Sequence, residues 1–201
     1  MDIRKKIAEL FATIFYIGKI KYAPGTLGSL VAFPLCYMIV YLTSNSQFVF
    51  QISSLNFEES QIFTLFTVAI STTLLIFIAG TYATKIYIEG AEEQDPSEVV
   101  IDELAGQMLT IILSSFSVFL LHGTQIASMY DAQTIDFLLL FLLPFILFRF
   151  FDIKKPWPIN WMDKNIKGAL GVMLDDIAAA LFATITHYAI IFIILDFYKM
   201  V

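Results

Sequence analysis

The chain has 201 residues, of which 58% are hydrophobic and 15% charged, with a formal net charge of −6. Soluble domains are nearer half apolar and a quarter charged, so this composition excludes an ordinary soluble domain. The apolar residues form long runs, which is typical of a polytopic membrane protein. We therefore predict an all-α membrane helical bundle, organised as one domain over residues 1–201.

The N-terminal stretch, MDIRKKIAELFATIFYIGKI (residues 1–20), predicts an amphipathic helix that lies on the membrane surface. A signal peptide also begins with basic residues, but here Glu9 interrupts the apolar part and no small-residue cleavage site follows. The apolar residues of the stretch fall on one helical stripe: Ile3, Ile7, Leu10, Phe11, Ile14 and Phe15.

Five apolar segments predict transmembrane helices, each close to the roughly 20 residues that a bilayer requires. The first and the fourth are short enough for a tilted or re-entrant path. Of the 12 lysines and arginines, 11 fall on one side of five alternating spans and only Lys199 on the other. This asymmetry predicts a cytoplasmic N-terminus and an outer C-terminus. The segments are Leu27–Thr43, Ile62–Ala83, Leu104–Leu121, Ile135–Phe151 and Ile177–Phe197.

The first polar motif is KYAPGTLGSL (residues 21–30), just before the first span. Pro24 and Gly25 predict a turn, and Thr26 is placed to cap the helix that follows. The free N–H groups of that helix start, with the Thr26 and Ser29 hydroxyls, suit a phosphate. An ordinary capped helix with glycines for close packing explains the motif as well, and on the motif alone it is the favoured interpretation.

The second motif is EEQDPSEVVIDELAGQ (residues 92–107). Asp95 reads as the N-cap of a helix that begins at Pro96 and continues into the third span. Asp102 and Glu103 would then lie on its second turn, near the edge of the hydrocarbon. Carboxylates at that depth are costly and favour a functional interpretation over a solvated acidic surface.

The third motif covers residues 148–180. Arg149 and Asp152 share one helical face, and two prolines predict a sharp turn that carries Lys155. Asp175 and Asp176 would stand at the start of the fifth span. Alternative explanations are topology and attraction to anionic lipid for the lysines, and helix N-terminal charge preference for the aspartates.

Carboxylates thus recur at one depth on three spans, and we expect them to converge at one inner-face site. Together they would repel one another unless a cation binds, and all-oxygen ligands suit Mg²⁺. Neighbouring lysine and arginine indicate an anionic substrate, such as a phosphate. We expect His122 and His187, like Cys36, to serve packing or hydrogen bonding. The five carboxylates are Asp102, Glu103, Asp152, Asp175 and Asp176.

Four ordered motifs, APGTLGSL, DPSEVVIDELAGQ, FRFFDIKKPWPI and GALGVMLDDIAA, resemble those of the bacterial phosphatidylglycerophosphatase A family. One departure is Ala169, where a glycine is expected. The resemblance implies Mg²⁺-dependent hydrolysis of phosphatidylglycerol phosphate to phosphatidylglycerol and phosphate, at the cytoplasmic face of the bacterial inner membrane, in phospholipid biosynthesis. Its implied active-site positions are Asp95, Asp102, Glu103, Asp152, Lys155, Asp175 and Asp176, with Thr26 and Ser29 as further candidates.

Two mechanisms remain open: attack by a metal-activated water, with a carboxylate as base, or direct attack by an aspartate. The chain lacks the Asp-x-Asp-x-(Thr/Val) pattern of phosphoaspartate phosphatases, which favours water. Arg149 and Lys155 are the expected phosphate-binding cations. The partners that we expect are a phospholipid and the membrane, and no nucleic acid. The alternative function is a cation channel or carrier that uses the inner-face carboxylates, although these stop at the edge of the spans.

Overall fold

The structure is a computed structural model and describes residues 2–46, 49–92, 95–122, 134 and 136–199. The described residues contain helices and no strand, so the predicted all-α class is confirmed. The elements are α1 (Ile3–Ala12), the 3-10 helix η1 (Ile17–Lys19), α2 (Pro24–Asn45), α3 (Phe57–Tyr87), α4 (Ile101–His122), the π-helical η2 (Phe137–Leu142), α7 (Leu143–Lys154), α8 (Ile159–Asn165) and α9 (Ala169–Lys199).

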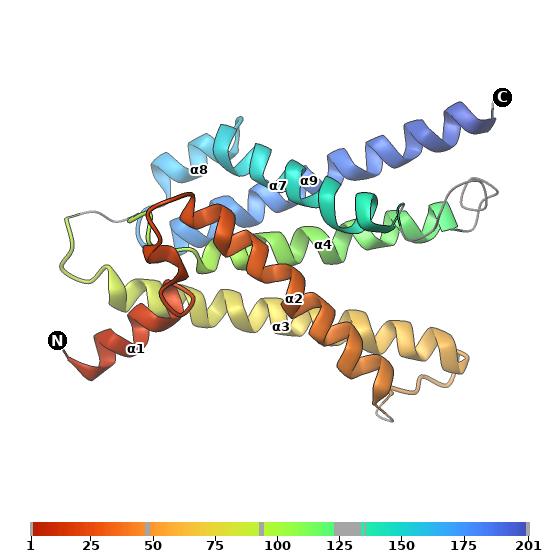
Figure 1. The fold of residues 1–201 in the computed structure, drawn as a ribbon, viewed down its shortest axis with the longest axis horizontal. Coiled ribbons are helices and arrows are strands. Elements are labelled where there is room, and N and C mark those ends of the chain that lie inside the picture. Colours follow the sequence, from red (N-terminus) through yellow and green to blue (C-terminus); the bar gives the residue numbers. More distant parts are fainter. Residues whose placement is uncertain (1, 47–48, 93–94, 123–133, 135, 200–201) are drawn as a thin grey trace.

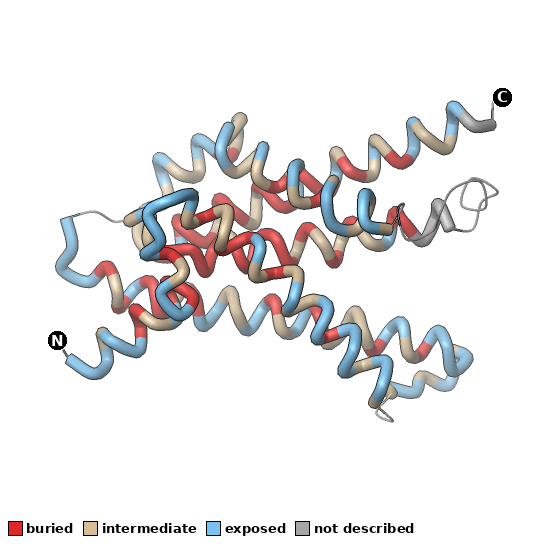
Figure 2. Tube along the Cα trace, in the orientation of Figure 1, coloured by how far each residue is buried: buried red, intermediate tan, exposed pale blue. Residues whose placement is uncertain are grey.

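The bundle is built around α4. Helices α2, α3, α4, the η2–α7 segment and α9 run along the long axis in alternating directions (Figure 1). Helix α4 packs against α2, α3, α7 and α9, and the buried residues concentrate along it (Figure 2). The N-terminus and the connections at residues 88–100 and 155–168 lie at one end, called here the polar end. The connection between α2 and α3 and the C-terminus lie at the opposite end.

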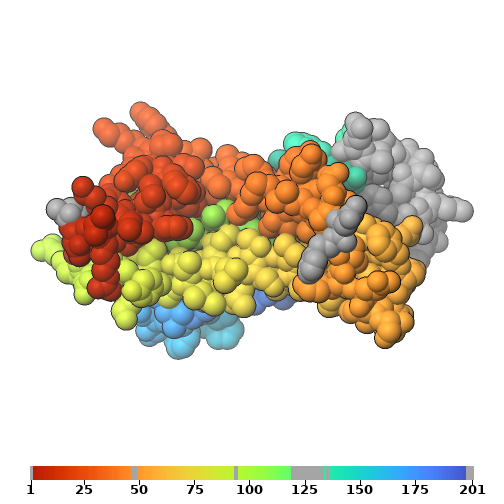
Figure 3. All heavy atoms as spheres, turned by 90° about the horizontal axis from the view of Figure 1, so that it is seen from below, coloured from red at the N-terminus to blue at the C-terminus, as the bar shows by residue number. Residues whose placement is uncertain are grey.

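Within the described part of the chain, four helices are long and apolar enough to cross a membrane: α2, α3, α4 and α9. Large apolar side chains cover their outer surfaces, as on α3, which forms much of the face in Figure 3. The predicted fourth span is present as η2 followed by α7. Pro144 has no N–H to donate to the carbonyl of Leu140, and the chain adopts a π-helical stretch there, with the Leu143 N–H donating to Leu138. Five segments therefore traverse the bundle, one of them with a break in its helical register.

The N-terminal helix is shorter than predicted, since α1 ends at Ala12 instead of continuing to residue 20. Three consecutive residues, Ile14, Phe15 and Tyr16, adopt left-handed backbone conformations with φ of 45°, 53° and 69°. These conformations turn the chain back toward the bundle. The helix is nevertheless amphipathic, because the exposed apolar residues Ile3, Ile7 and Phe11 recur every four residues along one side, and Lys5 and Lys6 fall between them.

The second motif folds differently from its prediction. Helix α4 begins at Ile101, so Asp95 and Pro96 precede it as part of a turn, in which the Val99 N–H donates to the Pro96 carbonyl. The Val100 N–H instead donates to the carbonyl of Ala12, and both valines are buried. Tertiary contact with the N-terminal segment thus replaces the expected capped helix. As a result Asp102 and Glu103 lie on the first turn of α4.

Two further helix starts differ from the predictions. Helix α2 begins at Pro24 after Ala23, which makes no side-chain capping bond, so Thr26 is the third helical residue and not the cap. Helix α9 begins at Ala169, so Asp175 and Asp176 lie on its second turn and not at its start. At the predicted sharp turn, α7 ends at Lys154 and Lys155 has a φ of 41°.

Candidate active site

Three carboxylates meet at the polar end of the bundle: Asp102 and Glu103 from α4, and Asp176 from α9. One oxygen of each lies within 4.8 Å of the others. Asp102 and Asp176 are buried, and Glu103 is half-buried. Each has an oxygen with no hydrogen-bond partner among the described residues (Asp102 Oδ1, Glu103 Oε2 and Asp176 Oδ2). We call these residues the carboxylate triad.

Two glycines allow this close approach. A Cβ on Gly25 of α2 would lie 2.0 Å from Oε1 of Glu103 and 3.2 Å from Nη2 of Arg149. A Cβ on Gly106, one turn beyond Asp102, would lie 2.6 Å from the ring of Phe148 and 3.0 Å from the carbonyl oxygen of Asp176. Helices α2, α7 and α9 can therefore approach α4 only because these positions have no side chain.

An arginine stands beside the triad. Arg149 of α7 forms an ion pair with Asp152, its Nη1 lies 3.9 Å from Glu103 Oε1, and it approaches the Ser29 hydroxyl at 3.5 Å. Asp152 in turn neighbours Glu103 and Asp176. The Nε of Arg149 is buried and finds no acceptor in the described part of the chain. One donor of a held guanidinium thus stays available for an anion.

A second ionic cluster lies next to the first. Lys155 forms ion pairs with Asp175 at 2.5 Å and with Asp163 of α8 at 2.7 Å. Oδ1 of Asp175 also accepts the backbone N–H of Asp176 at 3.1 Å. Asp95 and Asp163 line a pocket of about 230 Å³ beside this cluster. Adjacent residues on α9 therefore point to different places, Asp176 into the triad and Asp175 to Lys155.

Comparison with known proteins identifies the family. The family described as Phosphatidylglycerophosphatase A matches residues 10–191. The chain belongs to the phosphatidylglycerophosphatase A family. A Haemophilus influenzae protein named Phosphatidylglycerophosphatase A is 31% identical over 90% of this chain and 87% of its own length. The Escherichia coli protein of the same name is 28% identical over 85% of this chain and 76% of its own length.

A third relative, from Bacteroides thetaiotaomicron, is 28% identical over 88% of each chain and carries the provisional name of a phosphatidylinositol-3-phosphatase. No solved structure matches this chain. The resemblance noted from the four motifs is therefore confirmed, and so is the expectation of an enzyme, a phosphatase.

For this phosphatidylglycerophosphatase A family member, the predicted site residues separate into two groups. The structure brings Asp102, Glu103 and Asp176 together, with Asp152 and Arg149 beside them. Asp175 and Lys155 form the second cluster, with Asp95 near it. Ser29 borders the first group, and Thr26 is half-buried on the same turn of α2 as Gly25. The single convergence of five carboxylates is thus replaced by two adjacent clusters.

Three residues of the site were not among the predictions. Asp163 holds Lys155, but in sequence it reads as part of a short polar segment. Gly25 was interpreted as a turn residue and instead makes room for Glu103. Gln107 is fully buried one turn beyond Glu103, and both of its amide atoms lack partners within the described residues. In the sequence, the position of Gln107 one turn after Glu103, within an apolar span, was the signal that could have indicated a place for it in the site.

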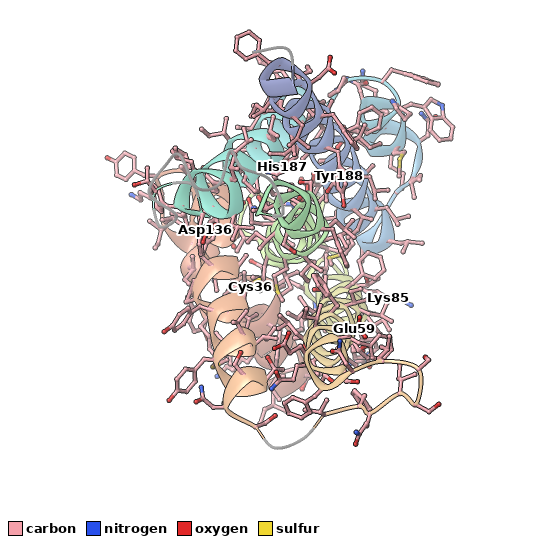
Figure 4. All side chains as sticks on the ribbon, turned by 90° about the vertical axis from the view of Figure 1, so that its right-hand side faces the viewer. Cys36, Glu59, Lys85, Asp136, His187 and Tyr188 are labelled. Carbon is pink, nitrogen blue, oxygen red and sulfur yellow. The ribbon has the colours of Figure 1, made fainter. Side chains whose placement is uncertain are left out.

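The histidine prediction agrees with the structure at His187, which is buried on α9 away from the triad. Its Nε2 donates to the Leu139 carbonyl at 2.8 Å, because a carbonyl can only accept, and its Nδ1 lies 2.8 Å from the Ser117 hydroxyl. The single proton of that hydroxyl also lies within reach of the Ser114 carbonyl, at 2.7 Å. In Figure 4 it lies between α9 and α4. The side chain of His122 lies outside the described residues.

Proposed function

We propose that this protein hydrolyses phosphatidylglycerol phosphate to phosphatidylglycerol and inorganic phosphate in phospholipid biosynthesis, with Mg²⁺, at the cytoplasmic face of the bacterial inner membrane. Family membership and the names of two relatives support the reaction. The observation that carries the proposal is the carboxylate triad with its unpartnered oxygens beside Arg149. A cluster of carboxylates next to a held cation suits a metal ion and a phosphate together.

The triad fits a divalent cation. Three carboxylate oxygens within 4.8 Å repel one another in a buried setting, and each residue retains an oxygen without a partner in the described structure. Oxygen ligands are those that Mg²⁺ prefers, so Asp102, Glu103 and Asp176 would hold the ion. When bound, Mg²⁺ supplies charge neutralisation and Lewis acidity at the phosphoryl group.

The protein's own groups account for the remaining chemistry. Arg149 is held by Asp152 and presents its unpartnered Nε to a phosphate oxygen. A triad carboxylate is placed to accept the proton of an attacking water, which is the mechanism that the sequence favours. Lys155 lies on the neighbouring cluster and offers a second positive charge to the headgroup.

Charge and position support the proposed membrane face. The basic residues predicted inside, including Lys19, Lys85 and Lys155, lie in or next to segments at the polar end, which also carries the triad. A positive-inside arrangement directs this end to the cytoplasm. The channel alternative lacks such support, because the sequence between the span ends on α2, α3 and α4 carries no Asp, Glu, Lys or Arg.

Phosphate release by the purified protein tests the proposal. We expect release from phosphatidylglycerol phosphate to require Mg²⁺ and to stop with EDTA. Phosphatidylinositol 3-phosphate and phosphatidic acid serve as comparison substrates. Asp102→Asn should lower the rate by roughly 10²–10⁴-fold, whereas Glu89→Gln, an exposed carboxylate at the same end, should leave it unchanged. No release from phosphatidylglycerol phosphate by the wild-type protein would refute the proposed reaction.

A further inference from the structure

An apolar pocket lies between helices of the bundle, away from the two ionic clusters. It has a volume of about 310 Å³ and is lined by residues of α2, α3, α4 and η2. In the end-on view of Figure 4, Cys36 lies among α2, α3 and α4. The Ser115 hydroxyl donates to the carbonyl of Ile112 on its own helix, so it offers the pocket no free donor. Residues that line the pocket include Cys36, Tyr37, Ala69, Ile112, Ser115 and Phe141.

Helices α2 and α4 also carry the candidate active site, and η2 continues directly into α7, which carries Arg149. These shared segments fix the depth of the pocket. Cys36 follows Gly25 by eleven residues on α2, Ile112 follows Glu103 by nine on α4, and Phe141 precedes Arg149 by eight. At 1.5 Å rise per residue, the pocket lies about 12 to 17 Å along the bundle from the triad. Half of a hydrocarbon core is about 15 Å thick, so one lipid tail that starts at the level of the triad ends near this pocket.

The contact between α2 and the η2–α7 segment connects the triad with the pocket. Ser29 of α2 approaches Arg149 of α7, and one turn further Phe33 contacts Phe145 and Phe141, with ring centroids 5.9 and 5.5 Å apart. Phe141 then forms part of the pocket wall. The α2 surface that borders the site therefore continues, with apolar side chains, to the pocket.

We propose that this pocket binds the end of one acyl chain of the lipid substrate while the headgroup lies at the carboxylate triad. The proposal rests on the proposed function, which supplies a two-tailed lipid at the triad. A wall of apolar side chains matches a hydrocarbon chain and rejects a polar headgroup. The pocket would thus set the depth at which the lipid binds. A tail long enough to fill the pocket places the phosphate at the triad, and the lipid is then held at both its tail and its headgroup.

Filling the pocket tests this role. Ala69 is buried on α3 and lines the pocket, so Ala69→Phe should occupy the space. We expect the variant to lose about tenfold or more in kcat/KM with dipalmitoyl phosphatidylglycerol phosphate. With the dihexanoyl substrate, whose tails are too short to reach the pocket, it should match the wild type. The matched control is Ile70→Phe, at an exposed neighbour on the same helix, which should behave as wild type with both lipids.

Cys36 provides a second measurement that does not depend on activity or on the folding of a variant. It is the only cysteine, it lines the pocket, and in the wild-type protein N-ethylmaleimide can report its access. We expect dipalmitoyl phosphatidylglycerol to slow its labelling severalfold in detergent, and dihexanoyl phosphatidylglycerol to have no effect. Labelled protein should reproduce the chain-length selectivity of Ala69→Phe, whereas treated Cys36→Ser should not.

The outcomes separate the two proposals. Two results together would overturn the acyl-chain pocket and leave the phosphatase intact. The first is that every protein hydrolyses the short-chain lipid, and Ala69→Phe loses activity equally, or not at all, with both lipids. The second is that long chains do not slow the labelling of Cys36. Absence of phosphate release by the wild type with either lipid would overturn the proposed function instead. Slowed labelling by long chains alone would then still support a lipid-chain pocket.

Discussion

Gly25 of α2 lies directly against Glu103 of α4: a Cβ on the glycine would be 2.0 Å from the carboxylate oxygen Oε1. The contact joins the first turn of one membrane helix to the first turn of another. The position of the Glu103 carboxylate in the triad therefore depends on the absence of a side chain at Gly25, a residue that lies far from Asp176 of α9 in the sequence. Adding a methyl group at position 25 therefore tests whether the triad depends on the position of the Glu103 carboxylate.

Gly25→Ala should reduce activity more than stability. The atom that the new methyl group meets is the end of a flexible side chain, which can move, and the movement takes Glu103 out of the triad. Phosphate release measured against Mg²⁺ concentration should show a higher Mg²⁺ requirement. Gly28→Ala is the matched comparison, since its Cβ would lie 2.9 Å from the backbone carbonyl of Val100 and should lower thermal stability. A fully active Gly25→Ala variant would contradict the role of Glu103.

Asp175 and Asp176 should respond differently to removal of charge. Asp176→Asn removes a carboxylate of the proposed Mg²⁺ site, so the Mg²⁺ requirement should rise and Mg²⁺ should raise the unfolding temperature in detergent less than it does for the wild type. Asp175→Asn disturbs Lys155 instead and should lower turnover while the response to Mg²⁺ stays as in the wild type. Identical Mg²⁺ titrations for the two variants would show that the division into two clusters has no functional meaning.

Lys155 should remain a cation across the working pH range. Partial burial lowers the pKa of Lys155, but ion pairs with Asp163 and Asp175 outweigh this effect and raise the pKa above its ordinary value. A raised lysine pKa keeps the charged form complete below the ordinary value of about 10.4, and the charge is lost only as pH rises through the higher folded value. Lys155→Ala should then lower the rate by about ten- to a hundredfold at every pH from about 6 to 9.

Lys155→Arg is the control for this prediction, because it keeps the charge. Its pH profile should have the same shape as that of the wild type over the same range. An alkaline decline in the wild type that moves to higher pH in Lys155→Arg would indicate that the lysine titrates in this range after all.

His187→Ala should affect stability and leave the chemistry unchanged. The substitution removes the hydrogen bonds of His187 to Ser117 and to the Leu139 carbonyl, at a cost of about 1–3 kcal/mol. Thermal unfolding in detergent should occur at a lower temperature, with normal phosphate release below it. Ser117→Ala should produce a smaller shift. Loss of activity in folded His187→Ala would restore histidine as a catalytic candidate.

The topology can be tested with single cysteines in a Cys36→Ser background. Cysteine at position 155 should react only from the cytoplasmic side and cysteine at position 199 only from the outside, as five alternating traverses require. Membrane-impermeant maleimide applied to intact cells and to inverted vesicles makes the measurement. Labelling of both positions from the same side would exclude an odd number of crossings.

The sequence by itself determined the all-α membrane class of the protein, and it singled out most of the candidate residues that the structure brings together at the polar end. Apolar runs long enough for a bilayer leave helices as the simplest way to satisfy the backbone, and the excess of basic residues on one side predicts the orientation. Near-membrane carboxylates such as Asp102 and Glu103 are conspicuous because their burial requires a compensating charge. The turn at Lys155 was also predicted from local chemistry, since two prolines follow it. The break at Pro144 was not predicted, although it has the same cause, because proline removes a backbone donor.

Only the tertiary structure decided which carboxylates share a site. Helical spacing cannot tell whether Asp175 or Asp176 faces α4, because neighbouring residues on a helix differ in direction by about 100° and the rotation of α9 is set by packing at Gly106. The start of α4 was likewise fixed by a hydrogen bond from the Val100 N–H to the carbonyl of Ala12. Ala12 lies far from Val100 in the sequence, and this bond overrides the local capping pattern. Asp163 joins Lys155 for the same reason: contacts between distant segments have no signature in the sequence of either segment.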